Sequence, residues 1–133
     1  MFGYDFVTPV TVAISDPQAD GTLVVFKVPS RWDKAELLSA WAVTDTTITK
    51  GSGTGIALRI LDYGSTGTAV SGTMSASLGG TAVTWTTDVP KDFTISEGTI
   101  DGGDYVVITY DETGTVAPLN IIVQMDFVNG VGA

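Results

Sequence analysis

The sequence contains neither cysteine nor histidine. Without cysteine the chain has no disulfide and no thiol nucleophile, and without both residues the usual ligands of a zinc site are missing. The lack of histidine also excludes a Ser-His-Asp triad and an imidazole proton shuttle. We therefore predict a protein that is not an enzyme and that carries no cofactor and no metal.

Positive charge is also scarce in this chain. Six Lys and Arg residues stand against 15 Asp and Glu among 133 residues, which gives a formal net charge of −9 and a pI near 4.1. The six cations are scattered, so we expect no nucleic-acid partner and no membrane partner. No apolar run approaches the roughly 18 residues of a membrane-spanning helix. The N-terminus shows no signal-peptide pattern, so we expect a complete product made in the cytoplasm.

The polar residues that favour helices are few, whereas residues that favour strands are abundant. The chain has 3 Glu, 2 Gln and 4 Lys, but 20 Thr, 16 Val and 9 Ile. Apolar residues alternate with polar ones in segment after segment, most clearly from Leu119 to Phe127, and turn signals recur about every 8–12 residues. We predict an all-β fold, a single antiparallel β-sandwich of eight to nine strands that is jelly-roll-like. Residues 1–133 form one domain in this prediction, with 1–6 as an N-terminal arm.

The alternation also predicts which side chains face the core. In the second apolar segment Val24, Phe26 and Val28 are expected to point inward. In the third segment, Ala35 to Thr44, the inner set is Leu37, Trp41 and Val43. Asp33 to Ala42 also carries a helix-capping pattern, but the β-rich composition favours a strand there. Trp41 and Trp85 are expected to fill the core because both are in phase with apolar neighbours.

Carboxylates are the only abundant reactive groups. Three pairs could act as acid and base or as ligands of a hard cation: Asp16 with Asp20, Asp101 with Asp104, and Asp111 with Glu112. Each pair lies beside Gly, Pro or a strand end, where Asp side chains commonly bond to nearby backbone N–H groups. We therefore predict turn roles for these residues and assign no catalytic or metal site.

Aromatic residues outside the predicted strands are the candidates for partner binding. Trp32 lies in a polar connector between Arg31 and Asp33, where it serves either as a plug under a loop or as an interface anchor. The first six residues contain three aromatics at a chain end, and this arm either docks on a partner or forms a first strand. The predicted partner-binding residues are Phe2, Tyr4, Phe6 and Trp32.

Four segments together resemble a known family: 25–29, 37–43, 99–110 and 119–127. In size, Gly and Thr richness, acidity and the Gly103-Asp104-Tyr105 sequence before the penultimate strand, the chain is similar to the small jelly-roll decoration, or cement, proteins of tailed-phage capsids and to head-fibre domains. The resemblance implies a non-enzymatic structural protein of the virion, located on the capsid exterior. It further implies a homotrimer that binds the major capsid protein and stabilises the shell.

Two other functions compete with this interpretation. A β-sandwich that presents aromatic rings could be a carbohydrate- or receptor-binding module, with Trp32 stacking on the ligand. A carboxylate-based glycosidase would instead use Asp101 and Asp104.

Overall fold

The computed structural model describes residues 7–15, 20–51, 53–80, 83–114 and 120–129. All ten regular elements in these ranges are β-strands, and the described residues include no helix that could cross a membrane. The strands are β1 (Val7–Ser15), β2 (Gly21–Lys27), β3 (Lys34–Thr44), β4 (Gly55–Asp62), β5 (Ser75–Gly80), β6 (Lys91–Asp92), β7 (Thr94–Glu97), β8 (Thr99–Asp101), β9 (Tyr105–Thr113) and β10 (Asn120–Asn129).

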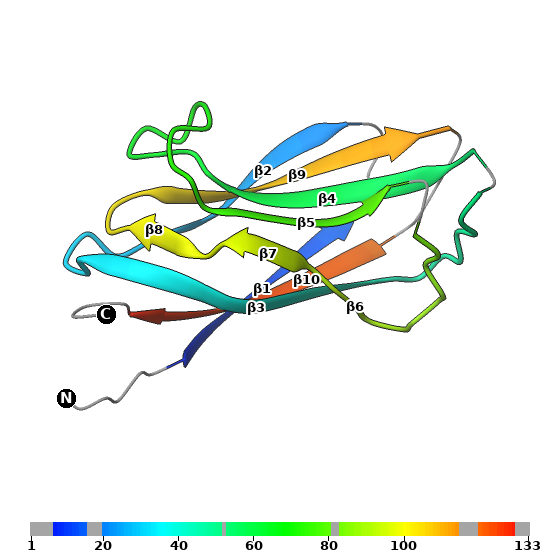
Figure 1. Ribbon diagram of the computed structural model, residues 1–133, viewed down its shortest axis with the longest axis horizontal. Helices are drawn as coiled ribbons and strands as arrows, with labels where there is room; N and C mark the ends of the chain where they lie inside the picture. The colour runs from blue at the N-terminus through cyan, green and yellow to red at the C-terminus, as the bar shows by residue number, and fades with distance from the viewer. Residues whose placement is uncertain (1–6, 16–19, 52, 81–82, 115–119, 130–133) are drawn as a thin grey trace.

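The strands form two antiparallel sheets that pack face to face (Figure 1). Sheet A has the order β1-β10-β3-β6, with β8 also paired to β3, and sheet B has the order β2-β9-β4-β5-β7. The predicted all-β sandwich is therefore confirmed. There are ten strands rather than eight or nine because the segment from Lys91 to Asp101 divides into three short strands.

The core lies between the two sheets and is built from alternating positions. Ile56, Leu58 and Ile60 of β4 are fully buried, as are the inward residues of β10 from Ile121 to Phe127. The rings of Phe26 and Phe127 stack across the sandwich with centroids 5.4 Å apart. The alternation predicted for the last strand is thus confirmed over the described part, whereas Leu119 lies outside it.

A β-bulge in β3 reverses the predicted faces of that strand. Leu37 pairs with Phe127 and Ser39 pairs with Asp126, so Leu38 is an extra residue without a partner of its own on β10. An extra residue moves every later side chain to the opposite face. The prediction that Trp41 and Val43 point inward was therefore wrong: both are half-buried on the outer face. The placement of Trp85 in the core is confirmed.

A second bulge has the same effect in β2. The register shifts between Val24, which pairs with Val107, and Phe26, which pairs with Val106. Phe26 packs against the core and Val28 is fully buried, as predicted. Val24 instead lies on the outer face and is 50% exposed, so its predicted inward orientation was wrong.

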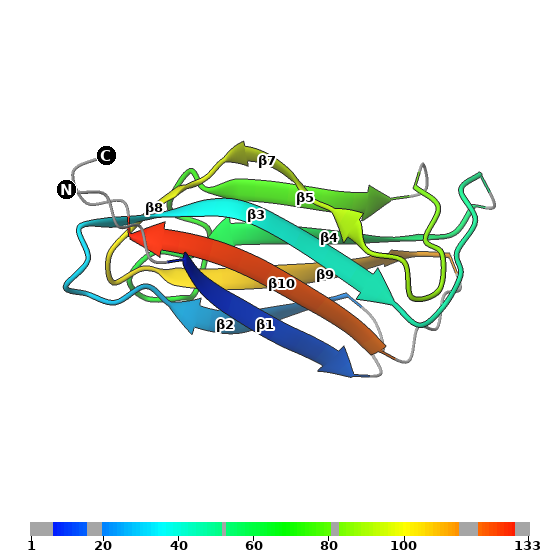
Figure 2. The same ribbon diagram turned by 90° about the horizontal axis from the view of Figure 1, so that it is seen from below.

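The two lateral sides of the sandwich differ in whether short strands cover the gap between the sheets. On one side, β6 pairs with β3, β7 pairs with β5, and β8 pairs with β3 again, so the chain crosses between the sheets and closes the gap. On the other side, β1 and β2 end their sheets (Figure 2). Neither of these two strands has a second strand partner within the described ranges.

Candidate functional site

Of the four predicted partner-binding residues, the structure describes Trp32 alone; Phe2, Tyr4 and Phe6 lie outside the described residues. Trp32 is in the connector between β2 and β3, and its backbone N–H donates to the carbonyl of Pro29 over 3.0 Å. Its side chain is half-buried and packs against the core. The contact with the core agrees with the predicted role of a plug under the loop. The part of the side chain that stays exposed is the surface that a binding partner would contact if Trp32 is an interface anchor.

The turn after β8 fixes the position of this connector. Gly102 N–H donates to the carbonyl of Asp33 over 3.0 Å, and Gly103 N–H donates to the carbonyl of Val28 over 2.9 Å. A Cβ on Gly102 would collide with the carbonyl oxygen of Trp32. Only glycine allows the two backbone segments to approach this closely, so Gly102 determines where Trp32 lies.

A buried carboxylate, Asp62, organises the loop between β4 and β5. Asp62 is 3% exposed, and its Oδ1 accepts a 2.7 Å hydrogen bond from the N–H of Gly64. Its backbone carbonyl accepts a 3.0 Å bond from Ser71 N–H. Asp62 was not among the residues predicted from the sequence. The available signal was the Asp-x-Gly sequence at a strand end, which is typical of a side chain that bonds to the backbone two residues on.

Asp104 forms a hydrogen-bonded carboxyl pair with Asp62. Burial, the charge of Asp62 and this hydrogen bond together raise the pKa of Asp104 to about 6. Asp101, the partner predicted for Asp104, instead forms a 2.9 Å ion pair with Lys34 at an exposed position. The turn predicted at 101–104 is present, since Asp104 N–H donates to the Asp101 carbonyl over 3.2 Å.

A second carboxyl pair joins the start of β2 to β9. A hydrogen bond with Asp20 is the main cause that raises the pKa of Asp111. Asp20 Oδ1 also accepts a 2.9 Å bond from the N–H of Glu112. The structure thus combines one member from each of two predicted pairs, while Asp16 lies outside the described residues. In the ranges described, no three His, Cys, Asp or Glu side chains are grouped to hold a metal ion.

A row of polar side chains crosses the outer face of sheet B. The strand registers place one residue from each of the five strands side by side: Thr22, Thr109, Arg59, Ser77 and Thr94. Arg59, at the centre of this polar row, is exposed and makes no ion pair or hydrogen bond with any other described residue. Its guanidinium therefore keeps its five donors available to a ligand.

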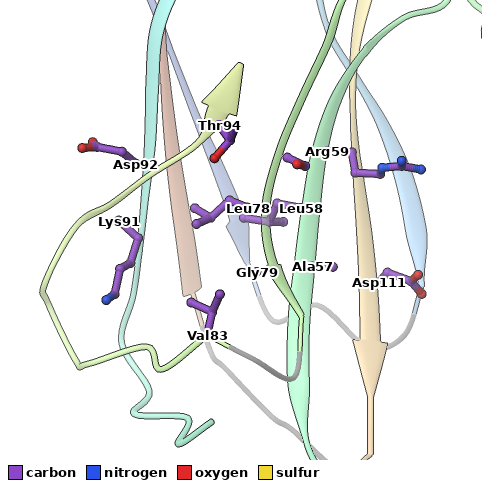
Figure 3. A pocket seen from close by; sticks show the side chains of 11 residues that line it. Ala57, Leu58, Arg59, Leu78, Gly79, Val83, Lys91, Asp92, Thr94 and Asp111 are labelled. Carbon is purple, nitrogen blue, oxygen red and sulfur yellow. The ribbon is translucent and has the colours of Figure 1, made fainter. Parts of the chain in front are cut away.

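The polar row borders a groove of about 550 Å³ that is lined by residues of β4, β5, β6, β7 and β9. Figure 3 shows Arg59 and Asp111 extending to one side of the sheet, and Lys91 and Asp92 on the opposite side. Ala57, Arg59 and Asp111 also line a neighbouring groove of about 340 Å³ toward β2. Together these form what we call the outer groove. It offers hydroxyl, guanidinium and carboxyl groups for hydrogen bonds to a polar ligand.

No protein-family model matches the chain, and no curated protein matches it. One solved structure with a similar fold is a chain of Bacillus endospore appendages, described as disulfide-linked pili. The match covers 96% of this chain and 90% of that chain, with 18% sequence identity and a TM-score of 0.42. A likeness of this degree supports no statement about function. The disulfide linkage of those appendages has no counterpart here, because the present chain lacks cysteine.

Proposed function

We propose that the protein is a non-enzymatic structural protein that decorates and stabilises a phage capsid as a homotrimer. In this proposal it binds the major capsid protein on the exterior of the virion. One observation carries the non-enzymatic part: the carboxyl groups that could do chemistry are engaged in loop-anchoring and inter-strand hydrogen bonds. Asp62 and Asp104 hold the loop after β4, and Asp20 bonds to the backbone of β9. Within the part of the chain that the structure describes, surfaces and strand edges are the features left to support a function.

The charge of the chain supports a role on a crowded shell. A net charge of −9 keeps densely packed copies soluble and gives the outer surface no attraction for nucleic acid. Attachment through several copies also strengthens binding without requiring a strong contact in each one. The capsid itself enters the proposal through the resemblance in sequence style to phage decoration proteins.

Binding to phage heads tests this proposal. The protein would be mixed with tailed-phage heads purified without their own decoration protein and sedimented, and head stability would be followed by heat-induced DNA release. We expect co-sedimentation and a higher release temperature. Removing residues 1–6 should abolish binding, whereas removing residues 131–133 serves as the matched truncation. Heads that neither bind nor gain stability would contradict the capsid role.

The contribution of Trp32 to this binding can be separated from its contribution to folding. Trp32→Phe retains an aromatic ring against the core, whereas Trp32→Ala removes both the packing and the exposed ring edge. If Trp32 is an anchor, Trp32→Phe should weaken binding to heads while its thermal unfolding stays close to that of the unmodified protein. Unchanged binding by a folded Trp32→Phe variant would leave Trp32 with the plug role alone.

The outer groove favours a second candidate, a carbohydrate- or receptor-binding module. Its hydroxyl groups and the free guanidinium of Arg59 suit a polyhydroxylated ligand. Stacking on an aromatic ring finds less support, since among the described residues Trp32 and Trp41 are half-buried and no aromatic side chain is fully exposed. Titration of a glycan panel, followed by NMR, tests this candidate. Arg59→Ala should remove binding and Lys50→Ala should retain it; a panel without any binder would rule the module out.

A further inference from the structure

The side of the sandwich between β1 and β2 leaves apolar side chains partly uncovered. Val10, Val12 and Ile14 of β1 point inward but are only half-buried. Leu23 of β2 pairs with Ile108 and so faces inward, yet it is 40% exposed. On the opposite side, which the segment from β6 to β8 closes, Phe93 and Ile100 are buried and Ile95 is half-buried against the core. We call the β1 and β2 side the open edge.

The backbone of the open edge is also available for pairing. An edge strand presents unpaired N–H and C=O groups, and natural proteins usually protect such strands with charges or by keeping them short. β1 has nine residues and no charged side chain, and β2 has seven residues with Lys27 as its only charge. On the closed side, β6, β7 and β8 have two, four and three residues. The open edge is therefore long, and Lys27 at the end of β2 is the only charged side chain on its two strands.

Two protective features interrupt the open edge without covering it. Pro9 removes one N–H group from β1, and the bulge at Val25 distorts β2. Two stretches remain regular, Thr11 to Ser15 of β1 and Gly21 to Val24 of β2. Asp20, which precedes β2, is directed away from this edge by its hydrogen bond to the backbone N–H of Glu112 on β9.

We propose that the open edge binds a second copy of this chain, with β1 of one copy against β2 of the next, a head-to-tail contact that can close into the homotrimer of the proposed function. The lack of carboxylates on these strands supports a second copy as the partner. Copies that each carry a net charge of −9 repel one another wherever carboxylates meet, whereas the strands of the open edge carry none. Pairing there continues the sheets between copies and removes the inward-facing Leu23 from water. This inference deepens the oligomeric part of the proposed function and rests on it.

Light scattering coupled to size exclusion tests the inference on the full chain. The unmodified protein should show a mass that is a multiple of 13.8 kDa. Leu23→Lys places an inward-pointing charge on the edge strand, a device that blocks strand pairing, and should raise the dissociation constant at least about tenfold. Leu38→Lys is the matched control, because Leu38 is 49% exposed on the outer face of β3, and it should leave the mass unchanged. A monomeric unmodified protein, or equal effects of both variants, would overturn the inference.

Hydrogen exchange gives an answer that does not depend on a folded variant. Backbone amides of Thr11 to Ser15 and Gly21 to Val24 should exchange more slowly at high than at low concentration of unmodified protein. Exchange that is fast at both concentrations would also overturn the inference. Binding to phage heads is measured separately with Leu23→Lys. If the oligomer depends on Leu23 but does not bind phage heads, the capsid role alone is contradicted. If the protein binds heads but the Leu23→Lys variant keeps the mass of the unmodified oligomer, the open-edge contact alone is contradicted.

Discussion

The carboxyl groups of Asp62 and Asp104 share a hydrogen bond at the base of the loop that joins β4 to β5. Asp62 also holds this loop through the N–H of Gly64. Burial and the nearby charge of Asp62 both disfavour the ionised form of Asp104 and raise its pKa, so the hydrogen bond is favoured when Asp104 is protonated. The attachment of the loop is therefore linked to pH.

This linkage predicts that Asp104→Asn stabilises the protein at neutral pH. The folded-state pKa of Asp104 is raised from 3.8 to about 6, so its stabilising contribution is present below pH 3.8 and is lost as the pH rises through about 6. Asparagine keeps a hydrogen bond to Asp62 without a charge. At pH 7.5 the variant should unfold with a free energy greater by about 1 kcal/mol, since solvent screens part of the effect. At pH 4 the difference should vanish, as measured by urea unfolding.

The matched control for this prediction is Asp92→Asn. Asp92 is exposed, and its side chain makes no hydrogen bond with the other described residues. As a substitution at an exposed position, Asp92→Asn should change the free energy of unfolding by no more than about 0.5 kcal/mol. A gain for Asp104→Asn that does not change with pH would contradict the raised pKa of Asp104.

Trp85 gives a second prediction, because its indole N–H is buried without a hydrogen-bond acceptor among the described residues. An unpaired buried donor lowers stability. Trp85→Phe removes this donor and retains most of the ring, so it should change the free energy of unfolding by less than about 1 kcal/mol. Trp85→Ala should cost about 3–5 kcal/mol, since Trp85 is fully buried. Similar losses for both variants, measured by denaturant unfolding, would show that the N–H contributes a hydrogen bond.

Gly102→Ala tests how closely the turn after β8 packs on the connector that carries Trp32. The added Cβ would collide with the backbone carbonyl of Trp32, and backbone atoms cannot move aside as a flexible side chain can. We expect a loss of about 2–3 kcal/mol in thermal unfolding. Gly51→Ala is the comparison: Gly51 has a φ of 81° but nothing near its added Cβ, so its loss should stay near 1 kcal/mol. A smaller loss at Gly102 than at Gly51 would contradict this close contact.

The fold class could be predicted from sequence because period-two alternation reports directly on half-buried strands. The predicted inward or outward orientation of the side chains was wrong after residue 38 in β3 and at Val24 in β2. A β-bulge is the cause in both strands. A bulge inserts one residue without altering local composition, so it leaves no mark in the alternation except a change of phase. Leu38-Ser39 and Val24-Val25 are the points at which an alternative phase begins.

The carboxyl pairs were harder to predict because they form between distant segments. Asp62 and Asp104 become neighbours since β4 pairs with β9, and Asp20 reaches Asp111 since β2 pairs with β9. Sequence proximity instead suggested Asp101 with Asp104 and Asp111 with Glu112. The polar row on sheet B likewise depends on four strand registers, and each register is fixed by tertiary packing rather than by the local sequence.

Deleting Leu38 tests whether the bulge in β3 is required by the sequence around it. Leu37 pairs with Phe127 and Ser39 pairs with Asp126, so a strand without Leu38 can keep both pairs in regular alternation, with Ala40 and Ala42 still inward and Trp41 still outward. We therefore expect the deletion variant to unfold cooperatively, with a loss below about 2 kcal/mol in the free energy of unfolding. Leu38→Ser keeps the extra residue, changes only an exposed side chain, and should stay within about 0.5 kcal/mol. Loss of cooperative urea unfolding in the deletion variant alone would show that the bulge is required for the fold.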